Sequence, residues 1–336
     1  MSILRKFLLP FSLLYGLIIW LRNIFYETGI FRSRSFPLPV ICVGNLSVGG
    51  TGKTPMIEYL LRLLLPHYRT ATLSRGYGRS TKGFILLDST DAATNVGDEP
   101  LQFKLKFPGA AIAVDENRQR GISNLLSGSN PEVILLDDAF QHRKVRAGLN
   151  ILLTSYDNMY YKDFMLPTGN LREPAIGAER AQIIVITKCP PDLSVEKQEI
   201  IRRKLHLKPN QHFYFSYIDY AIQLLNDKGA FPMEKLRGKR TGLVTGIANP
   251  RPFCDYLHKR GINFTHLDFD DHHIFTPKEL TRFRDFEVIL TTEKDYMRLK
   301  DIFEHERLYY IPIEARFIDK EEDFKQEIRQ FILNEK

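Results

Sequence analysis

The sequence predicts an α/β protein with a doubly wound, mostly parallel sheet and a second, smaller α/β domain. Short, almost continuous apolar runs alternate with helical patterns or polar loops, as is typical of strands buried on both faces of a parallel sheet. A glycine-rich loop after the first run leads into a helix, which is the loop type of P-loop NTPases. At 336 residues the chain is long enough to form two cores.

The N-terminal segment, residues 1–28, is predicted to form an apolar, membrane-associated helix. No charge occurs from Phe7 to Leu21, and no small-residue cleavage site of a signal peptide follows. The run is shorter than the roughly 20 residues of a transmembrane helix, so we expect it to lie in or dip into the membrane face. A buried core helix is the alternative, because periodicity does not distinguish a core from a membrane. The expected anchors are Trp20, Arg5, Lys6 and Arg22.

Residues 39–55, PVICVGNLSVGGTGKTP, carry the strongest functional signal. Glycines let backbone N–H groups face a polyphosphate, the helix N-terminus adds the positive end of its dipole, and Lys53 neutralises charge. Ser47 stands where the general motif has Gly, and a plain glycine-rich turn is the alternative. We expect a nucleoside triphosphate here, with Thr54 supplying a hydroxyl for Mg²⁺. The expected contacts are Ser47, Val48, Gly49, Gly50, Thr51, Gly52, Lys53 and Thr54.

The larger domain is predicted to span residues 29–222 and the smaller one residues 223–336. Near the boundary, the chain around Asn226 and Asp227 indicates a pair of strands. A charged amphipathic helix is expected near 320–334. The runs interpreted as strands after the glycine-rich loop are 70–74, 83–87, 110–114, 132–138, 150–154 and 183–187 in the first domain, and 241–247, 263–269, 286–292 and 307–313 in the second.

Two acidic pairs are candidates for metal binding and proton transfer. Asp137 and Asp138 end a buried apolar run, where a P-loop site usually holds the carboxylate that orients Mg²⁺ or its waters. Two turn-forming residues are the alternative. Asp98 and Glu99 precede an apolar helix, and they are either a helix cap with a first-turn acid or a general base with a Mg²⁺ partner.

Further polar loops supply candidates for binding a second substrate. In residues 270–273, DDHH, a His facing a carboxylate fits proton transfer better than metal binding, because no Cys or third His lies at ligand spacing. His142 is either a site residue or an ordinary loop residue. In residues 186–191, ITKCPP, a proline replaces the Asp of a guanine-specific N-K-x-D motif, so we expect adenine. The loops 73–80 and 166–174 hold candidate phosphate ligands, namely Arg75, Arg79 and Arg172.

The composition is that of a folded globular protein with a mild basic excess. Hydrophobic residues make up 43% of the chain, charged residues 26%, and the formal net charge is +7. This excess suits an anionic ligand or membrane surface, but it is too diffuse to indicate nucleic acid, which we do not expect as a partner. The cysteines have no metal-ligand spacing, so we expect buried, reduced thiols in a cytoplasmic compartment at Cys42, Cys189 and Cys254.

Several motifs together resemble the tetraacyldisaccharide 4'-kinases, the lipid A 4'-kinases of Gram-negative bacteria. In the family's order they are GNLSVGGTGKTP, SRGYGR, VGDEP, DDAFQH, LPTGNLREP, the DHH of FDDHHIF, and TTEKD. The resemblance runs from the apolar N-terminus to about Lys300, and Ser47 is no departure from the family's loop. It implies transfer of the γ-phosphate of ATP to the 4'-hydroxyl of a membrane-held, acylated glucosamine disaccharide 1-phosphate.

The resemblance also implies a role for each candidate residue. Lys53 and the loop would hold the phosphates, and Asp98 would accept the hydroxyl proton with His272 as its relay or orienting partner. ATP and Mg²⁺ are the expected cofactors, and a lipid A precursor places the enzyme at the cytoplasmic face of the inner membrane. The implied Mg²⁺ ligands are Thr54, Asp137, Asp138 and Glu99, and the implied substrate contacts are Arg75, Tyr77, Arg118, His142, Arg172 and Glu173.

Two other functions remain compatible with the sequence. A membrane-associated P-loop ATPase switch would use the same loop, but such a switch needs no acidic–histidine cluster in a second domain. A membrane scaffold that only retains nucleotide binding would not turn ATP over. Turnover with and without a lipid disaccharide acceptor separates all three.

Overall fold

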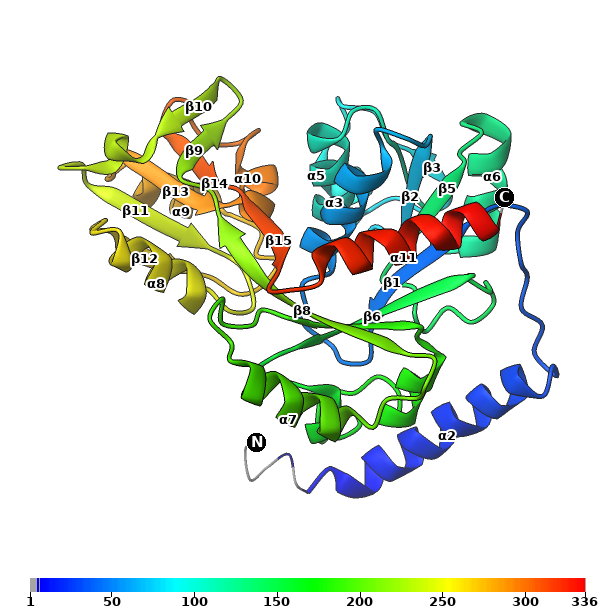
Figure 1. Ribbon diagram of the computed structural model, residues 1–336. Helices are drawn as coiled ribbons and strands as arrows, with labels where there is room; N and C mark the ends of the chain where they lie inside the picture. The colour runs from blue at the N-terminus through cyan, green and yellow to red at the C-terminus, as the bar shows by residue number, and fades with distance from the viewer. Residues whose placement is uncertain (1–4, 6, 336) are drawn as a thin grey trace.

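The computed structural model describes residues 5 and 7–335, so the expected anchor Lys6 lies outside the described residues. The larger of two sheets has nine strands in the order β15-β8-β7-β6-β1-β5-β2-β4-β3 (Figure 1). Neighbouring strands are parallel except at the two edges, where β3 and β15 are antiparallel. The strands are β1 (Val40–Asn45), β2 (Thr70–Ser74), β3 (Ile85–Leu86), β4 (Ala111–Val114), β5 (Val133–Asp137), β6 (Leu149–Ser155), β7 (Ile183–Thr187), β8 (His212–Tyr220) and β15 (Ile313–Phe317).

Helices cover both faces of this sheet, which confirms the doubly wound architecture. Alternate residues of β1 face opposite cores: Ile41 and Val43 pack with α3, α5 and α11, whereas Val40 and Cys42 pack with α6 and α7. The helices are α2 (Leu9–Glu27), α3 (Lys53–Leu64), α4 (Ala93–Val96), α5 (Asp98–Lys106), α6 (Arg118–Gly128), α7 (Val195–Leu205), α8 (Arg251–Lys259), α9 (Pro277–Phe283), α10 (Glu293–Leu299) and α11 (Glu321–Asn334), with 3₁₀ turns at Tyr160–Lys162, Ala175–Arg180 and Met233–Leu236.

The smaller sheet has six strands in the order β10-β9-β14-β13-β11-β12, and the expected strand pair around Asn226 and Asp227 is the β9–β10 hairpin. The strands are β9 (Gln223–Asn226), β10 (Gly229–Pro232), β11 (Thr241–Thr245), β12 (Thr265–Asp268), β13 (Val288–Thr292) and β14 (Leu308–Ile311).

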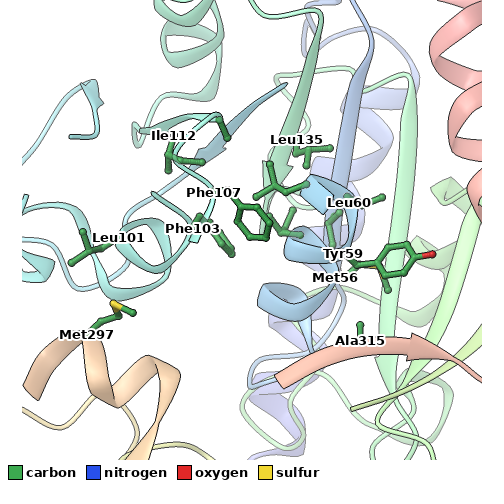
Figure 2. Packing of buried hydrophobic residues seen from close by; sticks show 14 of the residues in the cluster. Met56, Tyr59, Leu60, Leu101, Phe103, Phe107, Ile112, Leu135, Met297 and Ala315 are labelled. Carbon is green, nitrogen blue, oxygen red and sulfur yellow. The ribbon is translucent and has the colours of Figure 1, made fainter. Parts of the chain in front are cut away.

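The C-terminal segment corrects the expectation that residues 223–336 form the second unit. The run 307–313, predicted as one strand, is divided at Pro312: β14 belongs to the smaller sheet, and β15 crosses back to pair with β8. A proline lacks the N–H that a continuous ladder needs, so the chain changes sheets there. Figure 2 shows Ala315 of β15 beside Met56 and Tyr59 of α3, and the buried side chains of α11 join the same core. Phe324, Ile328 and Ile332 are those side chains.

Helix α2 lies outside both cores and along one side of the larger unit (Figure 1). Only 11% of its most apolar 18-residue window is buried, so the alternative of a buried core helix is wrong. By length and composition alone the helix could cross a membrane. Its polar stripe faces the protein: Ser12 donates to Thr168 Oγ1 at 2.7 Å, and Asn23 donates to Glu173 Oε2 at 3.3 Å. The exposed apolar side chains on the opposite face are Leu9, Phe11, Leu13, Leu14, Leu17, Ile18, Trp20, Leu21 and Phe25, and Phe7, just before the helix, is exposed as well.

Candidate active site

The phosphate-binding loop joins β1 to α3 and is braced from β7. Gly49 and Gly52 adopt positive φ angles of 99° and 85°, which a side chain would strain, and these turns bring Lys53 to the first position of the helix. Thr187 donates its hydroxyl proton to the Thr51 carbonyl at 2.7 Å, and the Lys188 ammonium donates to the Gly50 carbonyl at 2.6 Å. The loop carbonyls therefore point away toward β7, as a loop that offers N–H groups to an anion requires.

The remaining predicted loop residues lie around this turn. Ser47 is buried and bridges to Leu171, while Val48 is exposed and donates its N–H to the Asn170 carbonyl at 2.8 Å. Thr54 is half-buried in the first turn of α3. All the residues expected to contact the nucleotide thus lie in the strand end, the turn or the helix start.

Asp138 is the ionised carboxylate of the pair at the end of β5, and it directly follows the last strand residue, Asp137. Burial raises the pKa of this carboxyl, but the charges of Lys53 and Arg172 outweigh burial and hold it below its usual value. Lys53 Nζ lies 3.7 Å from Asp138 Oδ1, and Arg172 Nη2 lies 2.7 Å from the same oxygen. Arg172 also donates to the Asn45 side chain, so it clamps the ends of β1 and β5 together.

Asp137 is the neighbouring carboxylate and fits a cation site. It is 3% exposed, and its Oδ1 atom has no hydrogen-bond partner among the described residues. Burial, reinforced by the charges of Glu99 and Asp138, raises its pKa to about 7. A buried carboxylate oxygen of this kind is the donor that Mg²⁺ takes, and Thr54 and Glu99 are the other candidates nearby.

The described residues hold no cluster of three or more His, Cys, Asp or Glu side chains suited to a metal ion. Mg²⁺ at nucleotide sites uses one or two carboxylates and completes its shell with phosphates and water. The sparse donor set around Asp137 therefore suits Mg²⁺ with a nucleotide better than a protein-only metal cage. In residues 270–273 the two histidines have different partners: His273 lies 3.1 Å from the Glu279 carboxylate, and His272 lies 3.4 Å from Asp98.

Asp98 meets His272 across the two units. Gly97, and not Asp98, is the N-cap residue of α5, so the side chain of Asp98 is free for other contacts. Its Oδ2 atom lies 3.4 Å from His272 Nδ1 and accepts a hydrogen bond from Arg298 Nε at 2.7 Å. Burial raises the pKa of this carboxyl, but the bonds from His272 and Arg298 more than offset burial and lower it. Asp98 is thus held ionised and in contact with a histidine.

Lys294 helps to fix the orientation of His272. Its ammonium lies 3.0 Å from His272 Nε2 and 3.6 Å from Glu99 Oε1. Arg298 Nη2 lies 3.3 Å from His272 Nδ1, so each ring nitrogen faces one cationic donor and one carboxylate, Asp98 at Nδ1 and Asp271 at Nε2. The sequence does not single out Lys294 or Arg298 as site residues, although Lys294 belongs to the motif TTEKD. Lys294 follows a strand end in the first turn of α10, and Arg298 lies one turn later on the same helix.

The predicted substrate residues occupy different surroundings. Tyr77 is 70% exposed and its ring centroid lies 4.9 Å from that of His272, and Arg75 is exposed on the same loop. His142 is close enough to Arg118 and Arg75 for their charges, after burial, to lower its pKa to about 4. Its ring is therefore neutral near pH 7 and can accept or donate one hydrogen bond.

Two of these residues are enclosed. Arg118 is 3% exposed and donates to the main-chain carbonyls of Asp115 and Asp137, while its Nε has no partner among the described residues. Glu173 is 1% exposed and accepts from Asn23 of α2, Gln141 and Arg180. Glu173 thus ties the apolar helix to the site, and the structure gives it a positioning contact in place of an open surface.

A family model described as tetraacyldisaccharide-1-P 4'-kinase matches residues 4–333 of the chain. The tetraacyldisaccharide 4'-kinase of Flavobacterium johnsoniae is 52% identical over 336 residues, covering 99% of this chain and 98% of that protein. The protein of the same name from Bacteroides thetaiotaomicron is 41% identical and covers 98% of this chain and 93% of its own length. The crystal structure of LpxK from Aquifex aeolicus in complex with ATP superposes with a TM-score of 0.80 at 33% identity, over 98% of this chain and 100% of that one. The chain therefore belongs to the tetraacyldisaccharide-1-P 4'-kinase family.

Proposed function

We propose that this protein transfers the γ-phosphate of ATP to the 4'-hydroxyl of a tetraacylated glucosamine disaccharide 1-phosphate, a precursor of lipid A. The observation that carries the proposal is that phosphate-binding groups and proton-transfer groups both lie close to Asp137. Lys53 of the phosphate-binding loop lies 3.7 Å from Asp138, the neighbour of Asp137, and Glu99, whose charge also reaches Asp137, is next to Asp98, which lies 3.4 Å from His272. A nucleotide and a hydroxyl acceptor would therefore meet between these groups. The kinase relatives and the ATP-bound structure supply the substrate classes.

Phosphoryl transfer requires mainly alignment and neutralisation of charge. Lys53 and the N–H groups from Gly49 to Thr54 would hold the β- and γ-phosphates. Thr54, Asp137 and Asp138, with Glu99 beside them, would hold Mg²⁺, which supplies charge neutralisation to the phosphates when bound. Asp98, kept ionised by Arg298, would accept the proton of the attacking hydroxyl.

His272 would act as a positioning partner of Asp98. Its Nδ1 atom lies 3.4 Å from Asp98 Oδ2, and Lys294 holds the other ring nitrogen at 3.0 Å. The acceptor would lie near Tyr77, Arg75 and His142, because Tyr77 packs against His272 and the charge of Arg75 reaches His142. Arg172, Arg118 and Glu173 would then support the site by fixing the strand ends and α2.

We further propose that α2 attaches the enzyme to the cytoplasmic face of the inner membrane. Its apolar face is exposed and its polar stripe is hydrogen-bonded to the protein. A surface helix of a protein in water has the opposite arrangement, with its apolar face against the core. Fully burying one Leu, Ile or Phe side chain is worth about 1.5–3 kcal/mol, so the exposed set suffices for stable attachment.

The decisive experiment measures ATP turnover with purified protein, Mg²⁺ and detergent-dispersed tetraacyldisaccharide 1-phosphate. We expect stoichiometric transfer of the γ-phosphate to the lipid and almost no hydrolysis without it. Acceptor-independent hydrolysis at the same rate would instead identify an ATPase switch, and ATP binding without turnover a scaffold.

Membrane attachment is tested by replacing apolar residues on the free face of α2. Leu13→Gln/Leu17→Gln leaves the bonds of Ser12 and Asn23 in place, and should move much of the protein from the membrane to the soluble fraction. Use of bilayer-embedded acceptor should fall more than use of detergent-dispersed acceptor. The matched control, Ile222→Gln/Ile302→Gln, removes exposed apolar residues elsewhere and should change neither. Unchanged membrane partition in the α2 variant would refute attachment through this face.

A further inference from the structure

A basic hollow of about 730 Å³ opens beside the C-terminal end of α2; Asp98 and Lys53 do not line it, and His142 is the one candidate acceptor residue that does. Its floor is the apolar side of the larger sheet, including Cys42 and Leu136, and its walls come from the segments 26–33, 139–150 and 180–182. Its size lies within the range of about 300–1,000 Å³ typical of small-molecule sites. The cationic side chains that line it are Arg32, Arg143, Arg146 and Arg180.

Two of these arginines are held in place by the protein. The guanidinium of Arg143 lies 5.2 Å from the ring centroid of Tyr26 and its Nη1 lies 3.4 Å from Glu27 Oε1. The guanidinium of Arg180 lies 4.5 Å from the ring centroid of Phe140 and bonds Glu173. Because they are already ordered, these side chains would lose little entropy when an anion binds.

The other two arginines, Arg32 and Arg146, have no acidic partner among the described residues. Both are exposed at the opening, and neither side chain makes an ion pair there. Glu27 is the only acidic side chain that lines the described hollow, so positive charge is in excess. An anion with several oxygen acceptors would satisfy this set of donors.

The rim of the hollow is apolar and continues the exposed face of α2. Ile30 is 65% exposed, Phe31 is 42% exposed, and the ring of Phe31 packs edge-on against Phe25 of α2 at 5.3 Å. A free phosphate ion would make no use of these side chains. A lipid would, because its phosphate could lie among the arginines while its acyl chains lie over the rim.

We infer that this hollow binds the phosphate headgroup of an anionic bilayer phospholipid. The inference rests on the proposed membrane attachment of α2, which would bring the rim to headgroup depth. The site would orient the enzyme on the membrane in addition to the non-specific attraction between its net positive charge and the anionic surface.

The probe is dihexanoyl-phosphatidylglycerol, a short-chain lipid used below its critical micelle concentration, titrated calorimetrically into the full chain. We expect saturable binding of one lipid per chain, and at least tenfold weaker binding of dihexanoyl-phosphatidylcholine and of inorganic phosphate. Arg32→Gln/Arg146→Gln should weaken phosphatidylglycerol binding by roughly tenfold or more, since each basic residue at an anionic surface contributes about fivefold. Arg237→Gln/Arg240→Gln removes the same charge from exposed positions of the smaller unit and should have no effect.

A charge-neutral variant separates the hollow from a diffuse surface field. Ala147 lines the hollow, and Ala147→Phe would fill it without changing the net charge. Loss of phosphatidylglycerol binding in this variant supports the site, and retained binding overturns it.

Equal binding of inorganic phosphate would overturn the assignment to a lipid. A higher KM for detergent-dispersed acceptor in Arg32→Gln/Arg146→Gln would also overturn it, because the hollow would then belong to the acceptor site. Lipid binding is measured without turnover, so it is independent of whether the proposed kinase activity is found.

Discussion

The two sides of the candidate site are built differently. Lys53 begins α3 after the loop that follows β1, and Asp137 and Asp138 lie at the end of β5, the parallel neighbour of β1 in which Asp137 pairs with Val43. The proton-transfer side joins Asp98 of the larger unit to His272, Lys294 and Arg298 of the smaller one. The nucleotide side is thus fixed by the fold of one unit, whereas the other side exists only while both units are in contact.

The contact between the units has its own charged centre. The ammonium of Lys106 lies 2.7 Å from Glu58 Oε2 and 3.0 Å from Glu293 Oε2. Burial, with the nearby charge of Glu58, raises the pKa of Glu293 to about 7. Around this cluster, Leu101 of α5 faces Met297 of α10 (Figure 2). The helix that carries Asp98 at its start is therefore packed directly on the helix that carries Arg298.

The largest effect is expected on the nucleotide side. Lys53→Ala should lower kcat by about 10³-fold or more, because one positioned charge at the transferred phosphoryl group is lost and nothing else in the loop replaces it. Thermal unfolding should change little, since Lys53 is only partly buried. Lys197→Ala on the exposed side of α7 is the control. A folded Lys53→Ala protein with normal turnover would exclude the loop from the mechanism.

A second test asks whether the proton-transfer side acts as a unit. Asp98→Ala should lower kcat by roughly 10²–10⁴-fold with little change in ATP affinity, which is the range of a positioned base. His272→Ala should add little to that loss, because a partner that only holds Asp98 has no role once Asp98 is absent. The measurement is a double-mutant cycle on kcat. Losses that simply multiply would show that the two residues act independently.

Most of the larger sheet was predictable because its strands are buried on both faces. Such strands are continuous apolar runs, so they can be recognised in the sequence without knowing which strands lie beside them. The division at Pro312 was not predictable by the same means, because both halves of 307–313 are apolar and only pairing decides which sheet each joins. The exposed face of α2 likewise needed the structure, since its pattern fits a core as well as a membrane.

The nucleotide side could be predicted from spacing alone, since Lys53 and Asp138 follow apolar runs that end at one edge of the sheet. On the other side, the residue patterns made Asp98 and residues 270–273 candidates, but only the family resemblance selected His272 and paired it with Asp98. Lys294 and Arg298 lay within or just after a recognised motif, but a basic residue on an amphipathic helix is usually solvated. Their contacts come from the packing of α10 on α5, which no local pattern encodes.

Arg298 allows a finer test of the proton-transfer side. Arg298→Gln should lower kcat by about tenfold, less than loss of the base itself. It should also raise the pKa of Asp98, because the guanidinium now opposes the effect of burial. Activity needs the ionised carboxylate, so the acidic limb of the pH–rate profile should move to higher pH. The pKa of Asp98 is lower in the folded than in the unfolded protein, so its ionised carboxylate stabilises the fold at pH values above the unfolded-state pKa. This stabilisation is lost as the pH falls through the folded-state pKa, and Arg298→Gln should make it smaller.

Arg298→Lys is the matched variant, because it keeps the charge and loses the planar fork. In Arg298→Lys the acidic limb of the pH–rate profile should lie close to its wild-type pH, whereas kcat should recover only in part. A pH profile unchanged in Arg298→Gln would mean that Asp98 is not the group whose ionisation limits activity.

The smallest effect expected is on the nucleotide side, in the coupling of Mg²⁺ to protons at Asp137. The pKa of this carboxyl is raised to about 7, and a cation binds only the ionised form. Mg²⁺ affinity in the presence of ATP should therefore be about tenfold weaker at pH 6 than at pH 8. Without the cation, the raised pKa stabilises the fold at acidic pH, and that stability is lost as pH rises through about 7. Asp137→Asn removes this dependence, so the stability of this variant should vary less between pH 6 and pH 8.

Calorimetry of Mg·ATP binding in buffers of different ionisation enthalpy counts the protons that are released when Mg²⁺ binds. Subtracting the count for Asp137→Asn removes the titration of ATP itself, and a difference of zero would show that Asp137 is not the ligand that titrates.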